Sequence, residues 1–329
     1  MKSRMIMSRT PLRITFTGGG TDLPQYYTRG RNGAVISASI NKYIYVAVNK
    51  KFDDKIRVSY SVTEIEDSLD KIKHPSVREA LRLLNIDGGI EIVSISDIPS
   101  RGTGLGSSST FLVGLLNALH AFKGEHRSAK ELAEEAVKIE RHILKEPGGK
   151  QDQYIAATGG IQMLEFFQDE TVHVNHVIMN ENARAALESW ILAFYTGKER
   201  SSSEIHRKQS AGIEEKISGY DRMRDITYEA LKAISEADMI KLGECLDENW
   251  KIKKSLSEGI SDQWIDSLYQ KAMEMGAVGG KIIGAGGGGF LMLLSPPETH
   301  EEIIAEFSSL RSEKFSFDYT GSKIIFIGD

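Results

Sequence analysis

The chain has 329 residues and a formal charge of −5 at pH 7, and 40% of its residues are hydrophobic and 26% charged. These proportions are those of an ordinary soluble globular protein, which excludes a disordered or fibrous chain. With a pI near 6.0 the chain has no basic surplus for binding a phosphate backbone, so nucleic acid is not an expected partner.

The sequence predicts a cytoplasmic protein that does not enter a membrane. A single cysteine, Cys245, cannot form an internal disulfide, and the first 16 residues hold no long apolar run of the kind found in a secretory signal. The longest weakly polar run, residues 282–294, has 13 residues and contains five glycines, which is too short and too flexible for a transmembrane helix.

The first hundred residues are predicted to form mainly strands. Runs rich in β-branched and aromatic residues occur at 12–16, 35–48, 56–60 and 90–95, and turns rich in Gly, Asp and Asn separate them. Two helices are predicted next, at 107–122 and 128–144, and the second begins with a Ser128 to Glu131 capping box. Glu140 lies about 80° from the centre of the buried stripe of this second helix, at the edge of the core.

The rest of the chain alternates between strands and a helical block. Strands are predicted at 161–167, 172–179 and 190–195, helices within 201–255, strands around a glycine cluster at 279–294, a helix at 299–310 and a last strand at 323–327. The best boundary lies near 196–202, which gives domains 1–196 and 197–329. Because strands and helices come in mixed runs rather than strict alternation, the predicted fold class is α+β.

A glycine-rich turn runs directly into the helix predicted at 107–122. Residues 99–110 read PSRGTGLGSSST. The backbone N–H groups of such a turn, together with the partial positive charge of a helix N-terminus, suit a phosphate group. The segment is not a Walker A loop, because it lacks the Gly-Lys-Ser/Thr ending. The alternative is a plain strand-to-helix connection with a serine cap.

Two further glycine clusters occur, GGGTD at 18–22 and GAGGGG at 284–289. Taken singly, each can be a tight turn or a bulge. Three clusters beside the ends of predicted elements are better explained by the close approach of the backbone to a ligand.

The three motifs together resemble those of the GHMP kinases, the superfamily of galactokinase, homoserine kinase, mevalonate kinase and phosphomevalonate kinase. The segments 11–22, 99–110 and 281–290 occur in the order and at the distances typical of that superfamily, and the resemblance covers essentially the whole chain. It implies an N-terminal domain like domain 2 of ribosomal protein S5, a ferredoxin-like C-terminal domain, and ATP with Mg²⁺ in the cleft between them. The nucleotide ligands that it implies are Pro99, Arg101, Gly102, Gly104, Leu105, Gly106, Ser107, Ser108, Ser109, Gly286 and Gly287.

Within this superfamily, three segments resemble the heptose kinases and their relatives: PLRITFTGGGTD at 11–22, EPGGKQDQY at 146–154 and YTGKERSS at 195–202. The resemblance implies phosphorylation of the anomeric C1 hydroxyl of D-glycero-D-manno-heptose 7-phosphate, a step toward nucleotide-activated heptose, by a monomer or homodimer. The sugar part of the L-fucose kinases has a similar first motif. A fucose-, mannose- or galactose-like substrate is therefore the alternative.

The resemblance also assigns two catalytic residues. Asp152 lies in a segment similar to the one that holds the catalytic aspartate of galactokinase, and is expected to act as general base for the acceptor hydroxyl. The alternative for Asp152 is an N-cap of the following helix. Arg13, in the first motif, is expected to keep Asp152 ionised and to stabilise charge on the phosphate. A purely structural ion pair is the alternative for Arg13.

Metal ligands are expected at Ser108 and Glu140, by resemblance to mevalonate kinase, since a hydroxyl and a carboxylate are hard oxygen ligands of the kind Mg²⁺ prefers. The alternative for Glu140 is a solvated helix position. His173 and His176 are read as ordinary histidines, because this spacing on a strand directs their side chains to opposite faces.

The sugar is expected to contact the residues of the first glycine cluster, Gly19, Gly20, Thr21 and Asp22. A turn-stabilising aspartate is the alternative for Asp22. A sugar phosphate also needs cations at its far end, and Lys198 and Arg200 are the residues predicted to bind that phosphate, with Arg101 and Lys150 as rivals.

Two other functions are alternatives to that of a kinase. A catalytically silent sensor of ATP and sugar would be expected to lose a catalytic group, whereas Arg13 and Asp152 are both present. A decarboxylase of the mevalonate-diphosphate type also keeps an aspartate and an ATP site, but the segments at 146–154 and 195–202 fit it poorly.

Overall fold

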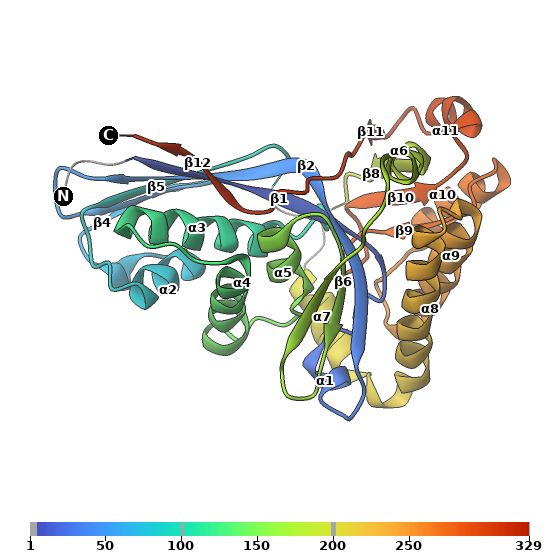
Figure 1. Cartoon of the computed structure of the whole chain (residues 1–329), viewed down its shortest axis with the longest axis horizontal. Coiled ribbons are helices and arrows are strands. Elements are labelled where there is room, and N and C mark those ends of the chain that lie inside the picture. The colour runs from blue at the N-terminus through green and yellow to red at the C-terminus, as the bar shows by residue number, and fades with distance from the viewer. Residues whose placement is uncertain (1–4, 100–101, 199–201, 329) are drawn as a thin grey trace.

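A computed structural model describes residues 5–99, 102–198 and 202–328 and contains two β-sheets with helices packed on them (Figure 1). The larger sheet has the order β12-β1-β2-β5-β3-β4, with β6 paired to β2 and β7 paired to β6. All its pairs are antiparallel except β3 with β5. Its strands are β1 (Ile6–Thr17), β2 (Gly33–Lys50), β3 (Ile56–Ser59), β4 (Thr63–Glu66), β5 (Ile90–Ser96), β6 (Ile161–Phe166), β7 (Val172–His176) and β12 (Lys323–Ile327).

The long strand β2 divides this sheet. Its first part pairs with β6 and its second part with β5, while β1 accompanies it on the other side throughout. The register of β1 on β2 shifts between Pro11 and Arg13, close to where β2 changes partner. Such an irregularity re-aims the side chains beside it, and here it lies at Arg13.

Helices cover one face of the larger sheet (Figure 1). They are α2 (Pro75–Leu83), α3 (Ser107–Lys123), α4 (Ala129–Val137) and α5 (Gln151–Thr158). The central helix α3 packs on β1 and β2, and nearly all its apolar residues are buried. All residues from 11 to 17 of β1 are buried, whereas residues 6–10 alternate between buried and partly exposed. The sheet is therefore covered on both faces at residues 11–17 and on one face at residues 6–10.

The smaller sheet has the order β11-β8-β10-β9 and is antiparallel. Its strands are β8 (Ile191–Tyr195), β9 (Gly279–Ile282), β10 (Phe290–Leu294) and β11 (Arg311–Glu313). Helix α9 packs on α8 and on β9, and α10 also contacts β9. Besides α2 to α5, the α-helices are α1 (Pro24–Tyr27), α6 (Glu181–Trp190), α7 (Ser202–Ala211), α8 (Ile217–Ser235), α9 (Met239–Leu256), α10 (Gln263–Glu274) and α11 (His300–Glu306).

The predicted α+β class is confirmed, and α3 and β12 occur almost where the sequence placed them. Helices α2, α6 and α10 were missed. The capping box of Ser128 and Glu131 starts α4 as predicted, but the helix continues as a π-helical segment, Lys138–Ile143. The wider turn of a π-helix rotates Glu140 inward, so the expected position at the edge of the core was wrong: Glu140 is only 1% exposed.

The two sheets do not divide at residue 196. Strand β8 precedes that residue yet belongs to the smaller sheet, and β12 returns at the end of the chain to pair with β1 in the larger one. The domain limits 1–196 and 197–329 stay a prediction.

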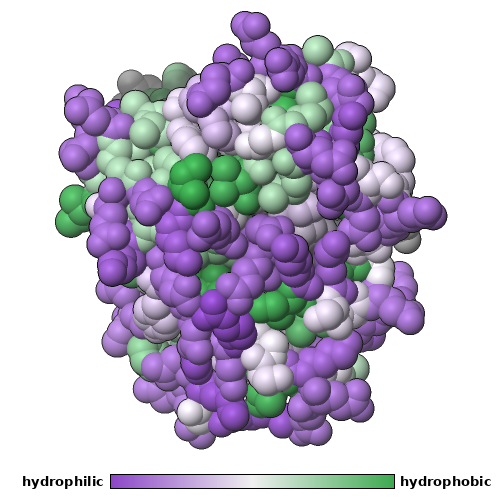
Figure 2. Space-filling view, turned by 90° about the vertical axis from the view of Figure 1, so that its right-hand side faces the viewer, coloured by the Kyte–Doolittle hydropathy of each residue, from purple (hydrophilic) through white to green (hydrophobic). Residues whose placement is uncertain are grey.

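The face on the side of the smaller sheet is largely hydrophilic, with its apolar residues in separate small patches (Figure 2). Apolar surface scattered in this way is normal for a protein surface in water. Among the described residues, no helix is long and apolar enough to cross a membrane.

Candidate active site

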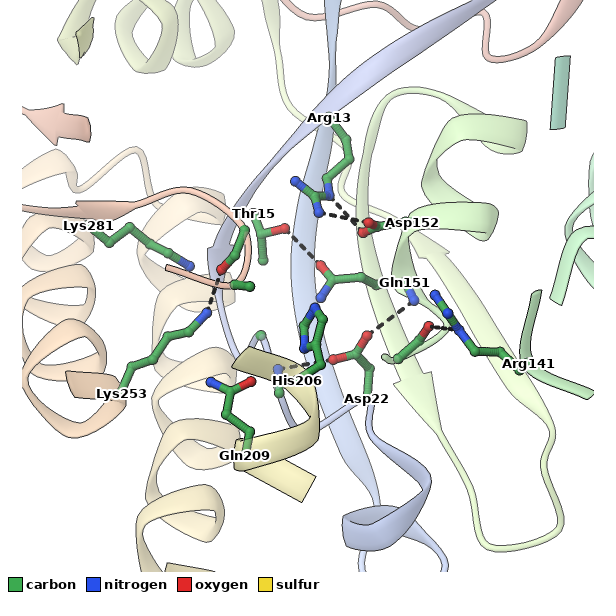
Figure 3. Close-up of a pocket in the computed structure, with 15 residues that line it drawn as sticks. Arg13, Thr15, Asp22, Arg141, Gln151, Asp152, His206, Gln209, Lys253 and Lys281 are labelled. Carbon is green, nitrogen blue, oxygen red and sulfur yellow. Dashed lines mark hydrogen bonds and ion pairs between the residues drawn. The ribbon is translucent and has the colours of Figure 1, made fainter. Parts of the chain in front are cut away.

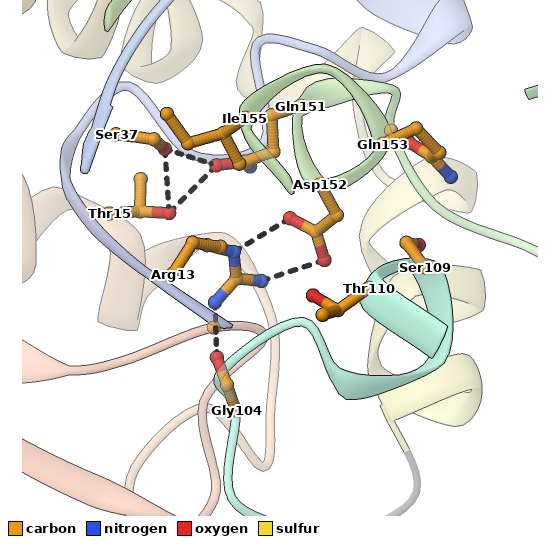
Figure 4. Close-up of polar contacts among 12 residues, drawn as sticks. Arg13, Thr15, Ser37, Gly104, Ser109, Thr110, Gln151, Asp152, Gln153 and Ile155 are labelled. Atoms are coloured by element: carbon orange, nitrogen blue, oxygen red, sulfur yellow. Dashed lines mark hydrogen bonds and ion pairs between the residues drawn. The ribbon is translucent and has the colours of Figure 1, made fainter. Parts of the chain in front are cut away.

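An arginine and an aspartate 139 positions apart form the centre of the site (Figure 4). Nε of Arg13 lies 2.7 Å from Oδ1 of Asp152, and Nη2 lies 2.8 Å from Oδ2. The third guanidinium nitrogen, Nη1, donates to the carbonyl oxygen of Gly104. This two-point geometry fixes both the position and the orientation of the carboxylate.

The charge of Arg13 decides the protonation state of Asp152. Burial by itself raises the pKa of this carboxyl, but the charge of Arg13 and its hydrogen bonds outweigh that effect and hold the pKa below its usual value. Asp152 is therefore an ionised hydrogen-bond acceptor at neutral pH. It is not the N-cap of α5, because that position is Lys150 and no side chain caps the helix.

The glycine-rich turn before α3 contacts the Arg13–Asp152 pair. The backbone N–H of Arg13 donates to the carbonyl oxygen of Leu105 at 3.1 Å. Gly106 adopts φ +78°, and a Cβ placed there would lie 3.2 Å from both the Arg13 side chain and the Asp152 carboxylate. Gly106 is also the N-cap of α3 and offers no side-chain cap, so the first N–H groups of this helix stay available to a ligand.

Glu140 lies beside that helix start. Its carboxylate accepts hydrogen bonds from Oγ of Ser108 at 3.0 Å and from Oγ of Ser109 at 2.7 Å, and Nε2 of Gln153 donates to it as well. Ser108 and Glu140, predicted as metal partners, are thus brought together. The solvated position considered for Glu140 is excluded by its burial.

An open cleft of about 810 Å³ lies on the outer side of the helix start. It is lined by Ser107, Ser108 and Pro99, and by residues from the larger sheet and α2. Aromatic rings cluster along it: the ring centroid of His74 is 4.8 Å from that of Tyr60 and 5.1 Å from that of Phe111. A surface that is aromatic at one end and rich in N–H groups at the other suits a nucleotide.

A second, polar cavity of about 40 Å³ lies on the inner side of the Arg13–Asp152 pair (Figure 3). The first glycine cluster forms part of its wall through Gly19, Gly20 and Asp22. Oδ1 of Asp22 accepts from the backbone N–H of Gly20 at 3.0 Å, and Oδ2 accepts from the N–H of Gln151 at 3.3 Å. Asp22 thus both stabilises its turn and faces the cavity.

Comparison with known proteins identifies the family. The models for the GHMP kinase N-terminal and C-terminal domains match residues 72–160 and 230–310. D-glycero-alpha-D-manno-heptose 7-phosphate kinase of Campylobacter jejuni is 31% identical, over 97% of this chain and 98% of that protein. The chain belongs to the GHMP kinase family. It is accordingly an ATP-dependent phosphotransferase, as the sequence predicted.

Solved structures of GHMP kinases have the same fold. A D-glycero-D-manno-heptose 1-phosphate kinase from Bacteroides thetaiotaomicron superimposes with a TM-score of 0.81 at 25% identity, covering 98% of this chain and all of that one. The mevalonate kinase of Methanococcus jannaschii gives a TM-score of 0.74 at 22% identity, covering 95% of this chain and 98% of that one. The predicted two-domain GHMP kinase fold is therefore confirmed.

Some residues predicted for this kinase site lie elsewhere. The hydroxyl of Thr21 is fully buried and bonds to the backbone of Gly18 and Ala34, so Thr21 holds the turn and does not face the cavity. The N–H of Gly287 donates to Ile260 at 2.7 Å, and a Cβ on Gly286 would also strike Ile260.

The third glycine cluster serves the site through other residues. Gly284 and Ala285, rather than Gly286 and Gly287, line the polar cavity. A Cβ on Gly284 would lie 2.6 Å from the carbonyl oxygen of Gly104, so the second and third motifs pack backbone against backbone. The nucleotide role of Gly286 and Gly287 stays a prediction.

Of the cations predicted for a substrate phosphate, the two within the described residues, Lys198 and Lys150, do not line the cavity. Nζ of Lys198 forms an ion pair with Asp262 at 2.6 Å and lies over the ring of Trp264. Its rival Lys150 pairs with Glu170. Arg200 and Arg101 lie outside the described residues.

The sequence analysis did not predict several side chains of the cavity, among them Arg141, His206, Gln209, Lys253 and Lys281. They come from the π-helical segment, α7, α9 and β9. Lys281 opens the third motif and Arg141 follows Glu140, so these two had a neighbouring signal. The other three lie in a polar helical block where no pattern distinguishes them.

Proposed function

We propose that this kinase transfers the γ-phosphoryl group of ATP to the anomeric C1 hydroxyl of D-glycero-D-manno-heptose 7-phosphate. The observation that carries the proposal is that the Arg13–Asp152 pair lines the polar cavity and packs against Gly106, the residue before Ser107 and Ser108 of the open cleft. The similarity to the Campylobacter jejuni heptose 7-phosphate kinase over nearly the whole of both chains supports this choice of sugar.

The open cleft is assigned to ATP. The rings of Tyr60 and Phe111 offer an apolar surface for the base, and the uncapped N-terminus of α3 offers N–H groups to the phosphates. With the base against the rings and the phosphates at the N-terminus of α3, the γ-phosphate would lie near Gly106, next to Arg13.

The residues beside the cleft fit Mg²⁺. Ser108 and Glu140 supply hard oxygen donors, and Oε1 of Gln153, buried in the same cluster, has no hydrogen-bond partner within the described residues. The described residues contain no group of three or more His, Cys, Asp or Glu side chains suited to a metal. A site with one carboxylate, completed by phosphate oxygens and water, is the usual arrangement for Mg²⁺. When bound, the ion would neutralise charge on the phosphates.

Asp152 is assigned to the acceptor hydroxyl. Since its pKa is lowered, the carboxylate is a weak base, and its first task is to orient the hydroxyl by accepting its hydrogen bond. In a loose phosphoryl-transfer transition state the proton leaves late, so positioning contributes more than early proton removal. Arg13 remains close enough to stabilise charge on the transferring group.

The acceptor sugar is assigned to the polar cavity. Asp22 and Gln151 present a carboxylate and an amide to its hydroxyls. The Oε1 atom of Gln151 is held by Thr15 at 2.7 Å and Ser37 at 3.0 Å, which leaves Nε2 to face the cavity (Figure 4). Preorganised donors and acceptors of this kind favour a polyhydroxylated ligand.

A coupled assay of ADP release tests the proposal. The enzyme with Mg²⁺ and ATP would be offered heptose 7-phosphate, mannose, mannose 6-phosphate, fucose, galactose and mevalonate. We expect kcat/KM for heptose 7-phosphate to exceed the others by at least tenfold. A preference for fucose or galactose would keep the kinase and replace the sugar, in line with relatives such as the L-fucokinase/L-fucose-1-P guanylyltransferase of Bacteroides fragilis, at 23% identity. No ADP release with any of the six compounds would favour a catalytically silent sensor of ATP and sugar.

A further inference from the structure

Two lysine side chains in the polar cavity have no carboxylate partner in the part of the chain that the structure describes. Lys253, on α9, is 3% exposed and Lys281, on β9, is fully buried. Nζ of Lys253 donates to the carbonyl oxygen of Gly284 at 2.7 Å, and Nζ of Lys281 donates to that of Phe16 at 3.2 Å. Within residues 5–99, 102–198 and 202–328 neither lysine forms an ion pair. Because an ammonium has three N–H donors, each lysine retains N–H groups that can donate to a ligand.

This arrangement is unfavourable in the protein alone. A buried ammonium without a counter-charge has lost its hydration and gained no compensating interaction. Burial lowers the pKa of Lys253 to about 8, and it lowers the pKa of Lys281 well below its usual value, with the neighbouring charge of Lys253 adding to the effect. An anion bound between the two lysines would remove the penalty.

The charge of the cavity fits a phosphate monoester. Four cationic side chains and two carboxylates line it, a surplus of two positive charges, the residues being Arg13, Arg141, Lys253 and Lys281 against Asp22 and Asp152. A phosphate monoester carries a charge of about −1.5 to −2 at neutral pH.

The two lysines are the least committed of these cations. Arg13 forms an ion pair with two hydrogen bonds to Asp152. Nε of Arg141 donates to the carbonyl oxygen of Gly149 at 2.9 Å, and its Nη1 donates to that of Glu146 at 3.2 Å. Each lysine, by contrast, makes one hydrogen bond to a backbone carbonyl and none to a carboxylate among the described residues.

Their position separates the lysines from the nucleotide. Neither lines the open cleft, and in Figure 3 they reach into the polar cavity from the side opposite Arg141, with Arg13 at the top. Nζ of Lys253 also lies within 3.7 Å of the point where a Cβ on Gly19 would stand, beside the first glycine cluster. The anion site therefore faces the acceptor sugar and not ATP.

We propose that Lys253 and Lys281 bind the phosphate group that the acceptor sugar already carries, and so select phosphorylated over free sugars. Two buried polar atoms of α7 line the same cavity without a partner among the described residues, Nε2 of Gln209 and Nδ1 of His206. Both lie where the remainder of that ligand would pass. The inference rests on the proposed function in taking a sugar phosphate as acceptor, and it replaces Lys198 as the phosphate ligand.

The test compares two acceptors that differ only in the fixed phosphate, heptose 7-phosphate and the free heptose. In Lys253→Gln we expect kcat/KM for the phosphorylated sugar to fall about 10- to 100-fold, the usual effect of losing a hydrogen bond between charged groups. The value for the free sugar should change less than threefold. Lys198→Gln is the matched control, since it removes an equal charge outside the cavity, and it should behave as wild type.

Two results would overturn the inference while leaving the heptose phosphate substrate intact. One is an equal loss on both acceptors in Lys253→Gln, and the other is a selective loss in Lys198→Gln. Conversely, if another sugar phosphate is the preferred acceptor and Lys253→Gln loses it selectively, the inference stands and only the proposed sugar fails.

A measurement on the unaltered enzyme covers the case in which the variant does not fold. Inorganic phosphate is small enough for the cavity, and we expect it to inhibit competitively against the sugar phosphate and not against ATP with Mg²⁺. Competition against ATP would assign the lysines to the nucleotide phosphates and overturn the inference. No inhibition at millimolar phosphate would overturn it as well.

Discussion

The open cleft and the polar cavity meet near Gly106, which contacts Asp152 of the cavity and precedes Ser107 of the cleft, yet the two are lined by different kinds of groups. The cleft measures about 810 Å³ and presents aromatic rings, serine hydroxyls and helix N–H groups. The cavity measures about 40 Å³ and is lined mainly by glycines and by charged and amide side chains. One surface suits a ligand by shape and backbone donors, the other by charge.

This difference predicts that the two ligands bind in different ways. The cleft is already in the size range of ligand pockets, roughly 300 to 1,000 Å³, while the cavity is far below it. ATP can therefore enter the structure as it stands, whereas a sugar phosphate has to displace side chains such as His206 and Gln209. Substitutions should separate accordingly into those that alter the KM for ATP and those that alter the KM for the acceptor.

The largest effect is expected where the two sites meet. Asp152→Asn keeps the shape of the side chain but removes the charge that orients the acceptor hydroxyl, so kcat should fall about 10²- to 10⁴-fold. The KM for ATP should change less than threefold, because Asp152 does not line the cleft. Steady-state kinetics with each substrate varied in turn measures both, and an undiminished kcat would refute the assigned role.

A substitution in the wall of the cavity should affect the acceptor alone. The ideal Cβ of Gly149→Ala would lie 1.8 Å from Oδ2 of Asp22, so the carboxylate has to move. We expect kcat/KM for the acceptor to fall about 10- to 100-fold, as after loss of a hydrogen bond to a charged group, while the KM for ATP stays as in wild type. A crystal structure of the variant with Asp22 unmoved would contradict this explanation.

On the cleft side, Ser108→Ala should weaken the use of Mg²⁺. It removes a hydroxyl that both lines the cleft and lies 3.0 Å from Glu140. The Mg²⁺ concentration for half-maximal rate should rise about 10-fold, near the lower end of effects seen when groups around a metal are removed. Ser109→Ala is the control, because Ser109 bonds to the same carboxylate at 2.7 Å without lining the cleft. If the two variants need the same Mg²⁺ concentration, Ser108 is not a ligand.

The smallest effect is a difference in pH dependence between the two substrates. Lys253 has a pKa of about 8 in the free enzyme, so it loses its charge as the pH rises above that value, while a phosphate monoester is already fully ionised. The KM for the sugar phosphate should rise up to tenfold per pH unit above pH 8, and the KM for ATP should not follow it.

His206, whose burial lowers its pKa to about 4, stays neutral over this range and adds nothing to the trend. The charged groups that act on Lys253 are Asp22, Arg13 and Asp152, and Lys281 is close enough for the charge of Lys253 to lower its pKa. A parallel rise in both KM values would point to a general loss of structure. In Lys253→Gln the rise should be smaller, because only Lys281 is then left to lose its charge.

Only the helix-start end of the cleft was predictable from the sequence, because its chemistry depends on the backbone, whereas the aromatic end with Tyr60 and Phe111 was not predicted. Gly106 has to adopt positive φ and approach the Arg13–Asp152 pair closely, and only glycine does both without strain. Such requirements leave clustered glycines and serines in the sequence, and α3 then follows from its apolar residues. The fold class and this motif could therefore be predicted well.

The cavity was predictable only in part because its side chains come from distant segments. Arg13 and Asp152 were paired through the family resemblance and not through any local pattern. Lys253, His206 and Gln209 lie on helices whose polar residues look alike in sequence, and tertiary packing alone decides which of them face the cavity. The π-helical turn that buries Glu140 was missed for a related reason, since a period of 3.6 residues was assumed where the chain makes a wider turn.

The pairing of β12 with β1 has a consequence for synthesis of the protein. Strand β1, which carries Arg13, has β12 as its outer neighbour, and the backbone N–H of Gly328 reaches the carbonyl oxygen of Met5 at 2.8 Å. While the chain is still emerging from the ribosome, residues 323–327 have not been made, and the outer edge of β1 has unpaired N–H and C=O groups open to another chain. A nascent or truncated polypeptide that lacks β12 should therefore aggregate more readily than one that contains it, because β12 covers the outer edge of the strand that carries Arg13.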